Sequence, residues 1–441
     1  MAQDLTPTPP GEPTPSEPAP SEPAPAEPAP ADPAPGEPVL RWSSTATTIP
    51  AVQRELARLW SSRDLYTEVD GVKQRHIAAR TSVMNLVVVA TSPEVAEGAA
   101  ATIARLAGRH PSRTLVVLPR DPDGPVSLRA QVEAHCILPR ADAPETCAEM
   151  VHLQAGGAAG RHLDAVIAPL LIHDLPVTVW WAGEPPFETE QAQAILEMAD
   201  RLVVDGSSWS ADGLARLRQV ALVQAERGLA ISDFALVRQS RWREAIASVF
   251  DMPDLLPYLR YTRRIAVTYA SHDLAAPPGL TNVVKPIYHV AWIASRLGMT
   301  VRQPLAPRPI RRTTRSAGFR GAAGWVHSAL LEGPQGGVRV SLGPAESALP
   351  GGTTLLVELL AERRGSELRA TVTGDADSVT VRAWLDGLRV LERDFLAPRR
   401  TDVDLLEEAI ELGVRDRIAT ATIRFAATLV SERLEPGNVA A

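Results

Sequence analysis

The sequence predicts an α/β domain at residues 41–205 and an α+β domain at 206–441, behind a disordered proline-rich tail at 1–40. Three observations predict this organisation. Strand-like and helix-like patterns alternate in the first half, strand-like runs follow one another directly in the second half, and prolines crowd the start. The sheet of the first domain is expected to be mixed and mostly parallel, because helices join most of its strands.

The tail carries the whole charge imbalance of the chain. The 441 residues include 52 acidic and 45 basic side chains, and seven of the acids lie in the first 38 residues with no base among them. Fourteen of the 39 prolines lie there too, which predicts an extended spacer. The alternative is a ligand for a proline-reading domain. The remaining chain is neutral, which argues against partners such as nucleic acid or a membrane surface recognised through bulk charge.

The first domain is read from apolar runs and their spacing. Continuous apolar runs at 82–90 and 114–119 predict strands covered on both faces, with a helix over 94–108 between them. Residues 126–138 and 146–154 predict a possible antiparallel hairpin. Further strands are predicted at 176–182 and 201–205, and further helices at 161–170, 188–199 and 210–227.

The second domain shows a different pattern. A helix at 239–250, a strand at 263–270 and a helix at 283–298 come first, and the arginine- and proline-rich segment 303–315 is expected to be an exposed loop. The runs WVHSALLEG, GVRVSLG, TTLLVELLAER and ELRATVTG then follow closely with glycine turns between them, which indicates antiparallel sheet. Two final helices are predicted at 402–413 and 415–433.

Cysteine content and the first residues bear on the compartment. Cys136 and Cys147 are too few for a disulfide framework, which is typical of the reducing cytoplasm. No secretory leader and no membrane-spanning run are expected, so the predicted location is cytoplasmic. Cys136 is interpreted as a small buried apolar residue, and the alternative is a redox pair with Cys147 across the hairpin.

The sequence predicts no cofactor, no metal ion and no catalytic residue. The glycines of GGAAG at 156–160 lack the G-x-G-x-x-G spacing, and neither a P-loop nor a G-x-S-x-G pattern occurs. The nine histidines form no H-E-x-x-H, and the cysteines form no C-x-x-C.

Two turns are candidate anion sites. His110, Ser112 and Arg113 gather at the turn between a helix and a buried strand, where an imidazole, a hydroxyl and a guanidinium could hold a phosphate or a partner carboxylate. Ser207 and Ser208 follow a strand and precede a helix, where backbone amides and hydroxyls could cradle an anion. In both places the alternative is a turn that only caps its helix.

Two adjacent tryptophans form a candidate partner contact. Trp180 and Trp181 end a strand just before Gly183 and a double proline, so the two indoles leave opposite faces of the sheet. Together with Arg113 they are candidate partner-binding residues, and core filling is the alternative.

Several segments, in order, resemble one family. They are TTIPAVQRELARLW, RTSVMNLVVV, RHPSRTLVVLPR, DAVIAPLLIHDLPVTVWWAGEPP, VDGSSWS and SRWREAIASVFD. This set is similar to the OpcA proteins, which are assembly proteins or allosteric effectors of glucose-6-phosphate dehydrogenase in cyanobacteria and other bacteria. The acidic proline-rich tail is not part of that pattern.

The resemblance implies a non-catalytic partner of glucose-6-phosphate dehydrogenase in the oxidative pentose phosphate pathway. Such proteins bind the dehydrogenase, favour its active oligomer and activate it allosterically. Cyanobacterial members respond to thioredoxin through cysteines near the C-terminus, whereas this chain has no cysteine after Cys147. The alternative from another class is a sugar-phosphate-binding enzyme or sensor of the same pathway.

Overall fold

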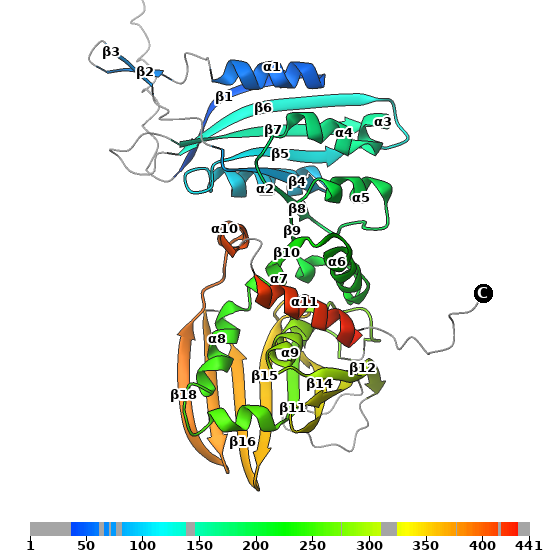
Figure 1. Cartoon of the computed structure of the whole chain (residues 1–441), viewed down its shortest axis with the longest axis vertical. Helices are drawn as coiled ribbons and strands as arrows, with labels where there is room; N and C mark the ends of the chain where they lie inside the picture. The colour runs from blue at the N-terminus through cyan, green and yellow to red at the C-terminus, as the bar shows by residue number, and fades with distance from the viewer. Residues whose placement is uncertain are drawn as a thin grey trace, which may run out of the picture.

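Two eight-stranded sheets, each packed against helices, organise the chain (Figure 1). The computed structural model describes residues 37–60, 82–137, 146–274, 276–309, 324–375, 377–412 and 416–430, and the course of β2 (Tyr66–Val69) and β3 (Val72–Arg75). The predicted fold class, an α/β unit followed by an α+β unit, is confirmed. The predicted tail lies outside the described residues up to position 36.

The N-terminal sheet has the strand order β1-β6-β7-β5-β4-β8-β9-β10. The strands from β7 to β10 in this order are parallel, and β6 and β1 continue the sheet in antiparallel fashion. The strands are β1 (Pro38–Ala46), β4 (Met84–Ala90), β5 (Ser112–Pro119), β6 (Ser127–Ile137), β7 (Thr146–Gly156), β8 (Val177–Ala182), β9 (Arg201–Val204) and β10 (Ala230–Asp233).

Helices cover both faces of the parallel strands. On β4, Val87 and Val89 join the apolar cluster that includes α1, whereas Leu86 and Val88 join the cluster that includes α2. This explains why β4 is apolar at nearly every position. The helices of this half are α1 (Ile49–Leu59), α2 (Pro93–Ala104), α3 (Ala158–Arg161), α4 (Leu163–Ile167), α5 (Glu190–Glu197), α6 (Leu214–Arg227) and α7 (Phe234–Val237).

The hairpin predicted at 126–154 is confirmed as β6 and β7, and a disulfide crosses it. Cys136 and Cys147 are register partners and are bonded to each other. Cys136 is buried, as expected, and it also meets Cys147 across the hairpin, because the antiparallel register brings the two side chains together on one face. A redox role for the pair stays a prediction.

The C-terminal sheet has the order β12-β13-β14-β11-β15-β16-β17-β18 and is antiparallel except for the pair β11 and β14. Its strands are β11 (Thr262–Ser271), β12 (Thr300–Pro309), β13 (Trp325–Gly333), β14 (Gly336–Glu346), β15 (Thr354–Arg363), β16 (Ser366–Gly374), β17 (Ser378–Leu385) and β18 (Leu388–Leu396). The helices of this half are α8 (Ser240–Val249), α9 (Val284–Arg296), α10 (Asp402–Leu412) and α11 (Arg417–Val430).

The structure differs from the sequence prediction at the segment 303–315 and at the end of the first sheet. The loop expected at 303–315 is wrong for its first part, because Thr300–Pro309 forms the edge strand β12; positions 310–315 lie outside the described residues. Prolines are tolerated there because an edge strand leaves alternate N–H groups unpaired. The N-terminal sheet also continues through β10, beyond the domain boundary expected at 205.

Helix α10 returns from the C-terminal sheet to the N-terminal half. Leu405, Leu406 and Ala409 are fully buried in the same cluster as Val116 and Trp180. The last elements of the chain thus complete the core of the first sheet. No described helix is both long and apolar enough to cross a bilayer.

Candidate functional site

The parallel part of the N-terminal sheet has the strand order of a dinucleotide-binding fold. Counted along the chain from β4, and leaving out the antiparallel β6, its strands lie in the order 3-2-1-4-5-6. In such sheets a ligand binds where the order reverses, at the carboxyl ends of the first and fourth strands. That position lies here between the ends of β4 and β8.

The start of α2 and the turn after β8 lie at this position. The Ser92 hydroxyl accepts the backbone N–H of Val95 at 3.3 Å and caps α2, and Glu94 stands in the first turn. A hydrogen bond with Ser92 lowers the pKa of Glu94, which keeps a negative charge where a pyrophosphate would bind. A Cβ built on Gly183, after β8, would lie 2.7 Å from Thr91 Cγ2. This crevice does not offer the glycine-lined cradle that a dinucleotide needs.

The predicted anion cluster of His110, Ser112 and Arg113 does not surround one common space. Arg113 is buried, and its Nε donates to Glu149 Oε2 at 2.5 Å. The Ser112 hydroxyl lies 3.0 Å from the Thr114 hydroxyl within the core. His110 faces two carboxylates of α10. The anion-binding role of these residues stays a prediction.

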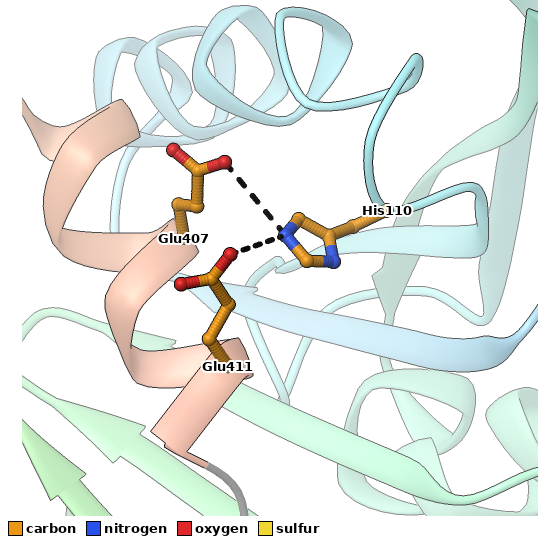
Figure 2. Close-up of side chains that lie close together, drawn as sticks. All are labelled: His110, Glu407 and Glu411. Atoms are coloured by element: carbon orange, nitrogen blue, oxygen red, sulfur yellow. Dashed lines mark ion pairs between the residues drawn. The ribbon is translucent and has the colours of Figure 1, made fainter.

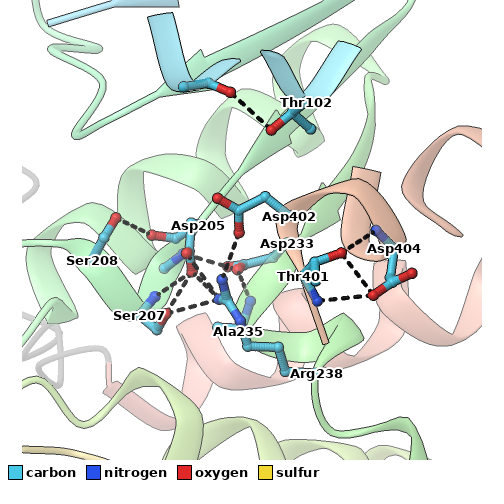
Figure 3. A network of polar contacts seen from close by, with 12 residues as sticks. Thr102, Asp205, Ser207, Ser208, Asp233, Ala235, Arg238, Thr401, Asp402 and Asp404 are labelled. Carbon is cyan, nitrogen blue, oxygen red and sulfur yellow. Dashed lines mark hydrogen bonds and ion pairs between the residues drawn. The ribbon is translucent and has the colours of Figure 1, made fainter. Parts of the chain in front are cut away.

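Ser207 and Ser208 close the turn after β9 around a carboxylate (Figure 3). Asp205 Oδ1 accepts the N–H of Ser207 at 3.1 Å and its hydroxyl at 2.6 Å, and the Ser208 hydroxyl donates to the Asp205 carbonyl at 2.8 Å. Arg238 donates to both carboxylate oxygens of Asp205 at 2.8 Å. Because a carboxylate already occupies this turn, an anion there would compete with it for Arg238.

A buried carboxyl group joins this turn to α9. Asp233 Oδ1 accepts the N–H groups of Gly206 and Ala235, and Oδ2 accepts the Tyr288 hydroxyl at 2.6 Å. Burial and the charge of Asp205 raise the pKa of Asp233 to about 6, although the three hydrogen bonds act in the opposite direction. Because Asp233 ends β10 and Tyr288 lies on α9, their hydrogen bond links the N-terminal sheet to a helix of the C-terminal half.

Trp180 and Trp181 lie on opposite faces of β8, and both are buried. Trp180 is 5% exposed and packs 5.8 Å from the ring of Phe234, whereas Trp181 is 3% exposed and belongs to the cluster on the other face. In the isolated chain both indoles fill cores. Their role in partner binding, together with Arg113, stays a prediction.

A groove of about 400 Å³ opens beside α2, with alanines of that helix on one side and polar side chains of β6 and β7 on the other. Glu133 Oε2 lies 2.7 Å from His135 Nε2 and 3.3 Å from His152 Nε2. Burial acts to raise the pKa of Glu133, but hydrogen bonds and charge from the two histidines outweigh it and lower the pKa to about 2. Sequence reasoning missed this groove, because its residues meet only through the register of the hairpin.

The C-terminal sheet has one face packed against helices and one open face. Val357 and Leu359 of β15 are buried against Ile246 of α8, and their neighbours Glu358 and Leu360 point to the opposite side, where they are partly exposed. The same alternation holds on β14, β16 and β17. The side chains opposite the helices form what we call the open face.

Two rows of side chains cross the open face in register. The rows consist of Arg264, Leu360, Arg369 and Trp384, and of Ala266, Glu358, Thr371, Arg382 and Glu392. The two oxygens of Glu358 lie 2.8 Å from Arg369 Nη2 and 3.7 Å from Arg264 Nη1. The Arg369 guanidinium also lies 5.7 Å from the centre of the Trp384 ring. Tryptophan and arginine are residue types that are enriched in protein interfaces.

The comparisons with known proteins cover both halves of the chain. Residues 103–221 match the family model described as the glucose-6-phosphate dehydrogenase subunit N-terminal domain, and residues 229–423 match the model of its C-terminal domain. Among solved structures, an oxidoreductase of Bacillus subtilis is 10% identical with a TM-score of 0.42, over 80% of this chain and 97% of that one. An aldose-aldose oxidoreductase of Caulobacter crescentus is 12% identical with a TM-score of 0.40, over 79% and 98%.

Relatives by sequence are OpcA proteins of the oxidative pentose phosphate (OxPP) cycle. The protein of Synechocystis sp. is 28% identical over 196 residues, which are 44% of this chain and 39% of the relative. The protein of Nostoc punctiforme is 26% identical over 207 residues, or 47% and 40%. The matches span about two fifths of the length of these curated relatives. The two family models together match most of the chain, and this protein belongs to the OpcA family of glucose-6-phosphate dehydrogenase subunits.

Proposed function

We propose that this chain is a non-catalytic subunit that binds glucose-6-phosphate dehydrogenase in the cytoplasm, stabilises its active oligomer and so activates it allosterically. The descriptions of the two matching family models name this dehydrogenase, which supports it as the partner. At the ends of β4 and β8, the acidic Glu94 in the first turn of α2 and the close approach of Gly183 to Thr91 support a binding role over dehydrogenase chemistry of its own.

The observation that carries the proposal is the open face of the C-terminal sheet. Two charge pairs on this face lie within the chain, Glu358 with Arg369 and Arg382 with Glu392. A partner that covers this face therefore leaves these charges with partners from their own chain, which limits the cost of removing them from water. Trp384 and Leu360 supply apolar area beside them.

Activation follows from unequal binding. A subunit shifts the equilibrium between two forms of its partner only by the difference in its affinity for them. A tenfold preference for the active oligomer corresponds to about 1.4 kcal/mol, which one well-packed aromatic anchor supplies.

The experiment compares two variants of the full chain in binding and activation of purified dehydrogenase. Trp384→Ala removes the anchor of the open face and should weaken binding at least about tenfold, with a matching rightward shift of the activation curve. Leu222→Ala on α6, whose side chain is 57% exposed, is the control and should behave as the wild type. Circular dichroism establishes that both variants fold.

Two outcomes contradict the proposal. Equal binding by Trp384→Ala and the wild type would remove the open face as the contact surface. Turnover of glucose 6-phosphate with NADP by this chain alone, with no dehydrogenase added, would contradict the non-catalytic role.

The groove beside α2 favours a second candidate function, which is sensing of a sugar phosphate. Glu133, its two histidines and Gln131 line one wall with hydrogen-bonding groups suited to a polyol. Calorimetry with glucose 6-phosphate alone tests it. Binding that Glu133→Gln abolishes would support the sensor, and no heat at millimolar ligand would exclude it at cellular concentrations.

A further inference from the structure

Three potential metal ligands meet where α10 packs on the N-terminal half (Figure 2). His110 stands in the turn before β5, where its backbone N–H donates to Leu106 O at 2.8 Å. Glu407 and Glu411 lie one turn apart on the same face of α10. His110 Nε2 lies 3.9 Å from an oxygen of each carboxylate, and the three ligand atoms lie within 4.8 Å of one another.

The imidazole nitrogen at the centre of this group makes no hydrogen bond to any described residue. His110 Nε2 is buried, and its separation of 3.9 Å from each carboxylate is too long for a hydrogen bond. A buried nitrogen that faces two carboxylates without bonding to either is a donor set that a divalent cation satisfies.

We propose that His110, Glu407 and Glu411 bind a divalent transition-metal ion of the zinc class, with water completing its coordination. One imidazole and two carboxylates suit such an ion better than Mg²⁺ or Ca²⁺, which prefer oxygen ligands alone. At bond lengths of about 2.0–2.2 Å, tetrahedral ligand atoms lie about 3.4 Å apart, so each carboxylate needs to approach by about half an ångström. The side chain of Glu411 is 63% exposed and is free to make that shift.

Arg109 would compete with a metal ion for the carboxylate of Glu407. Its Nη1 lies 2.6 Å from Glu407 Oε1, the same oxygen that faces His110. A carboxylate has two oxygens, so the guanidinium can hold one while the other binds the ion. The Arg109 side chain is 59% exposed, so this rearrangement meets little steric resistance. Arg109 would then orient Glu407 as an outer-shell contact.

Binding of the ion would hold α10 against the N-terminal half. The ion would join the turn at His110 to a helix almost three hundred residues later in the chain. Because the unfolded chain does not hold these ligands together, binding to the folded protein should raise the midpoint of thermal unfolding as Zn²⁺ is added.

The test is calorimetric titration of the full chain, first stripped with a chelator, with Zn²⁺ alone. We expect one ion per chain. We also expect affinity at least about tenfold lower in His110→Asn and in Glu411→Gln, since each substitution removes one ligand. His152→Gln is the matched control, because that histidine also lies beside a carboxylate, that of Glu133, and its loss should leave the affinity unchanged.

Thermal unfolding provides the second readout. At a Zn²⁺ concentration near the dissociation constant of the wild type, Zn²⁺ should raise the midpoint of the wild type and of His152→Gln, and should raise that of Glu411→Gln much less. Binding by His110→Asn and Glu411→Gln equal to that of the wild type would overturn the proposal. Loss of binding in His152→Gln alone, or displacement of Zn²⁺ by equimolar Mg²⁺, would also overturn it. If the wild type binds no Zn²⁺ and Glu411→Gln still has a lower midpoint, the three residues only form ion pairs that stabilise the fold, and the proposal is wrong.

Discussion

At the scale of single residues, a histidine in the core of the C-terminal half illustrates how burial changes a pKa. His289 of α9 is fully buried, neither of its ring nitrogens has a hydrogen-bond partner among the described residues, and its ring lies 5.2 Å from that of Trp242. Burial, with the charges of Arg243 and Lys285, lowers the pKa of His289 to about 3. The imidazole is therefore neutral at physiological pH and acts as an aromatic filler.

His289→Phe should stabilise the protein. The substitution keeps the aromatic contact and removes two buried polar atoms, which we expect to raise the free energy of unfolding by about 1–2 kcal/mol. Urea unfolding at neutral pH measures this. A destabilised variant would show that the ring nitrogens are bonded, for example to buried water.

Asp233 should make stability depend on pH in the acidic range. Its pKa is raised from 3.8 when unfolded to about 6 when folded, so the folded state retains its proton over this interval. The stabilisation from this proton is fully present below pH 3.8 and is lost as the pH rises through 6. For this group alone, the free energy of unfolding falls by about 3 kcal/mol across that window.

Asp233→Asn tests this by removing the titration while keeping an oxygen for the N–H groups of Gly206 and Ala235. The difference between the free energies of unfolding of variant and wild type should change by about 2 kcal/mol between pH 4 and pH 6, which is most of the full effect. Other groups titrate in both proteins and cancel in the difference. A difference independent of pH would contradict the raised pKa.

At the scale of elements, the disulfide fixes the end of the β6–β7 hairpin. Cys136 and Cys147 are 1% and 2% exposed, and Trp60 after α1 packs against them. The bond closes a loop between residues separated by 11 positions, and loss of chain entropy for such a loop stabilises the folded state by up to about 3 kcal/mol.

Replacing both cysteines by alanine should lower the urea midpoint of unfolding. Dithiothreitol should lower the midpoint of the wild type toward that of the variant and leave the variant unchanged. Equal midpoints for the variant and the oxidised wild type would show that the hairpin is held by its ladder and by Trp60 alone.

The elements also show what sequence patterns can predict. The strands at 82–90 and 114–119 were predictable because burial on both faces makes them continuously apolar. The edge strand β12 was not, because its three prolines and mostly exposed side chains are typical of a loop. Strands β17 and β18 were missed altogether, and β18 is exposed at most positions and carries little periodic signal.

Some residues of the candidate sites were predictable from the sequence and others were not. Patterns in the sequence placed Ser207 and Ser208 after a strand, where the structure has them, but gave no sign of Asp205 at the centre of their turn. Neither the two rows of the open face nor the meeting of His110 with α10 could be predicted, since both depend on register and packing between distant segments.

At the scale of the whole molecule, α10 makes the two sheets depend on each other. The helix follows β18 and buries Leu405 and Leu406 against the N-terminal sheet. In addition, Arg201 Nη1 of β9 donates a hydrogen bond to the carbonyl of Ile410 at 2.8 Å. The Asp233–Tyr288 hydrogen bond is a second link between the two halves.

Leu406→Ala should therefore destabilise both halves together. Truncation of this fully buried side chain should cost about 2–5 kcal/mol, whereas Leu412→Ala on the same helix, where the side chain is 41% exposed, should cost little. Hydrogen exchange should become faster in β4 and β8 and also in β11. Faster exchange confined to the first sheet would show that the halves unfold independently.

The late position of α10 also affects how the protein is made. Arg201 and its acceptor Ala409 are 208 residues apart. At a translation rate of about 5–20 residues per second, roughly 10–40 s separate their synthesis. Throughout that interval the part of the N-terminal core that packs against Leu405 and Leu406 is uncovered, although α2 already lies on the same face of the sheet. Exposed apolar surface of this kind is what ribosome-associated chaperones bind.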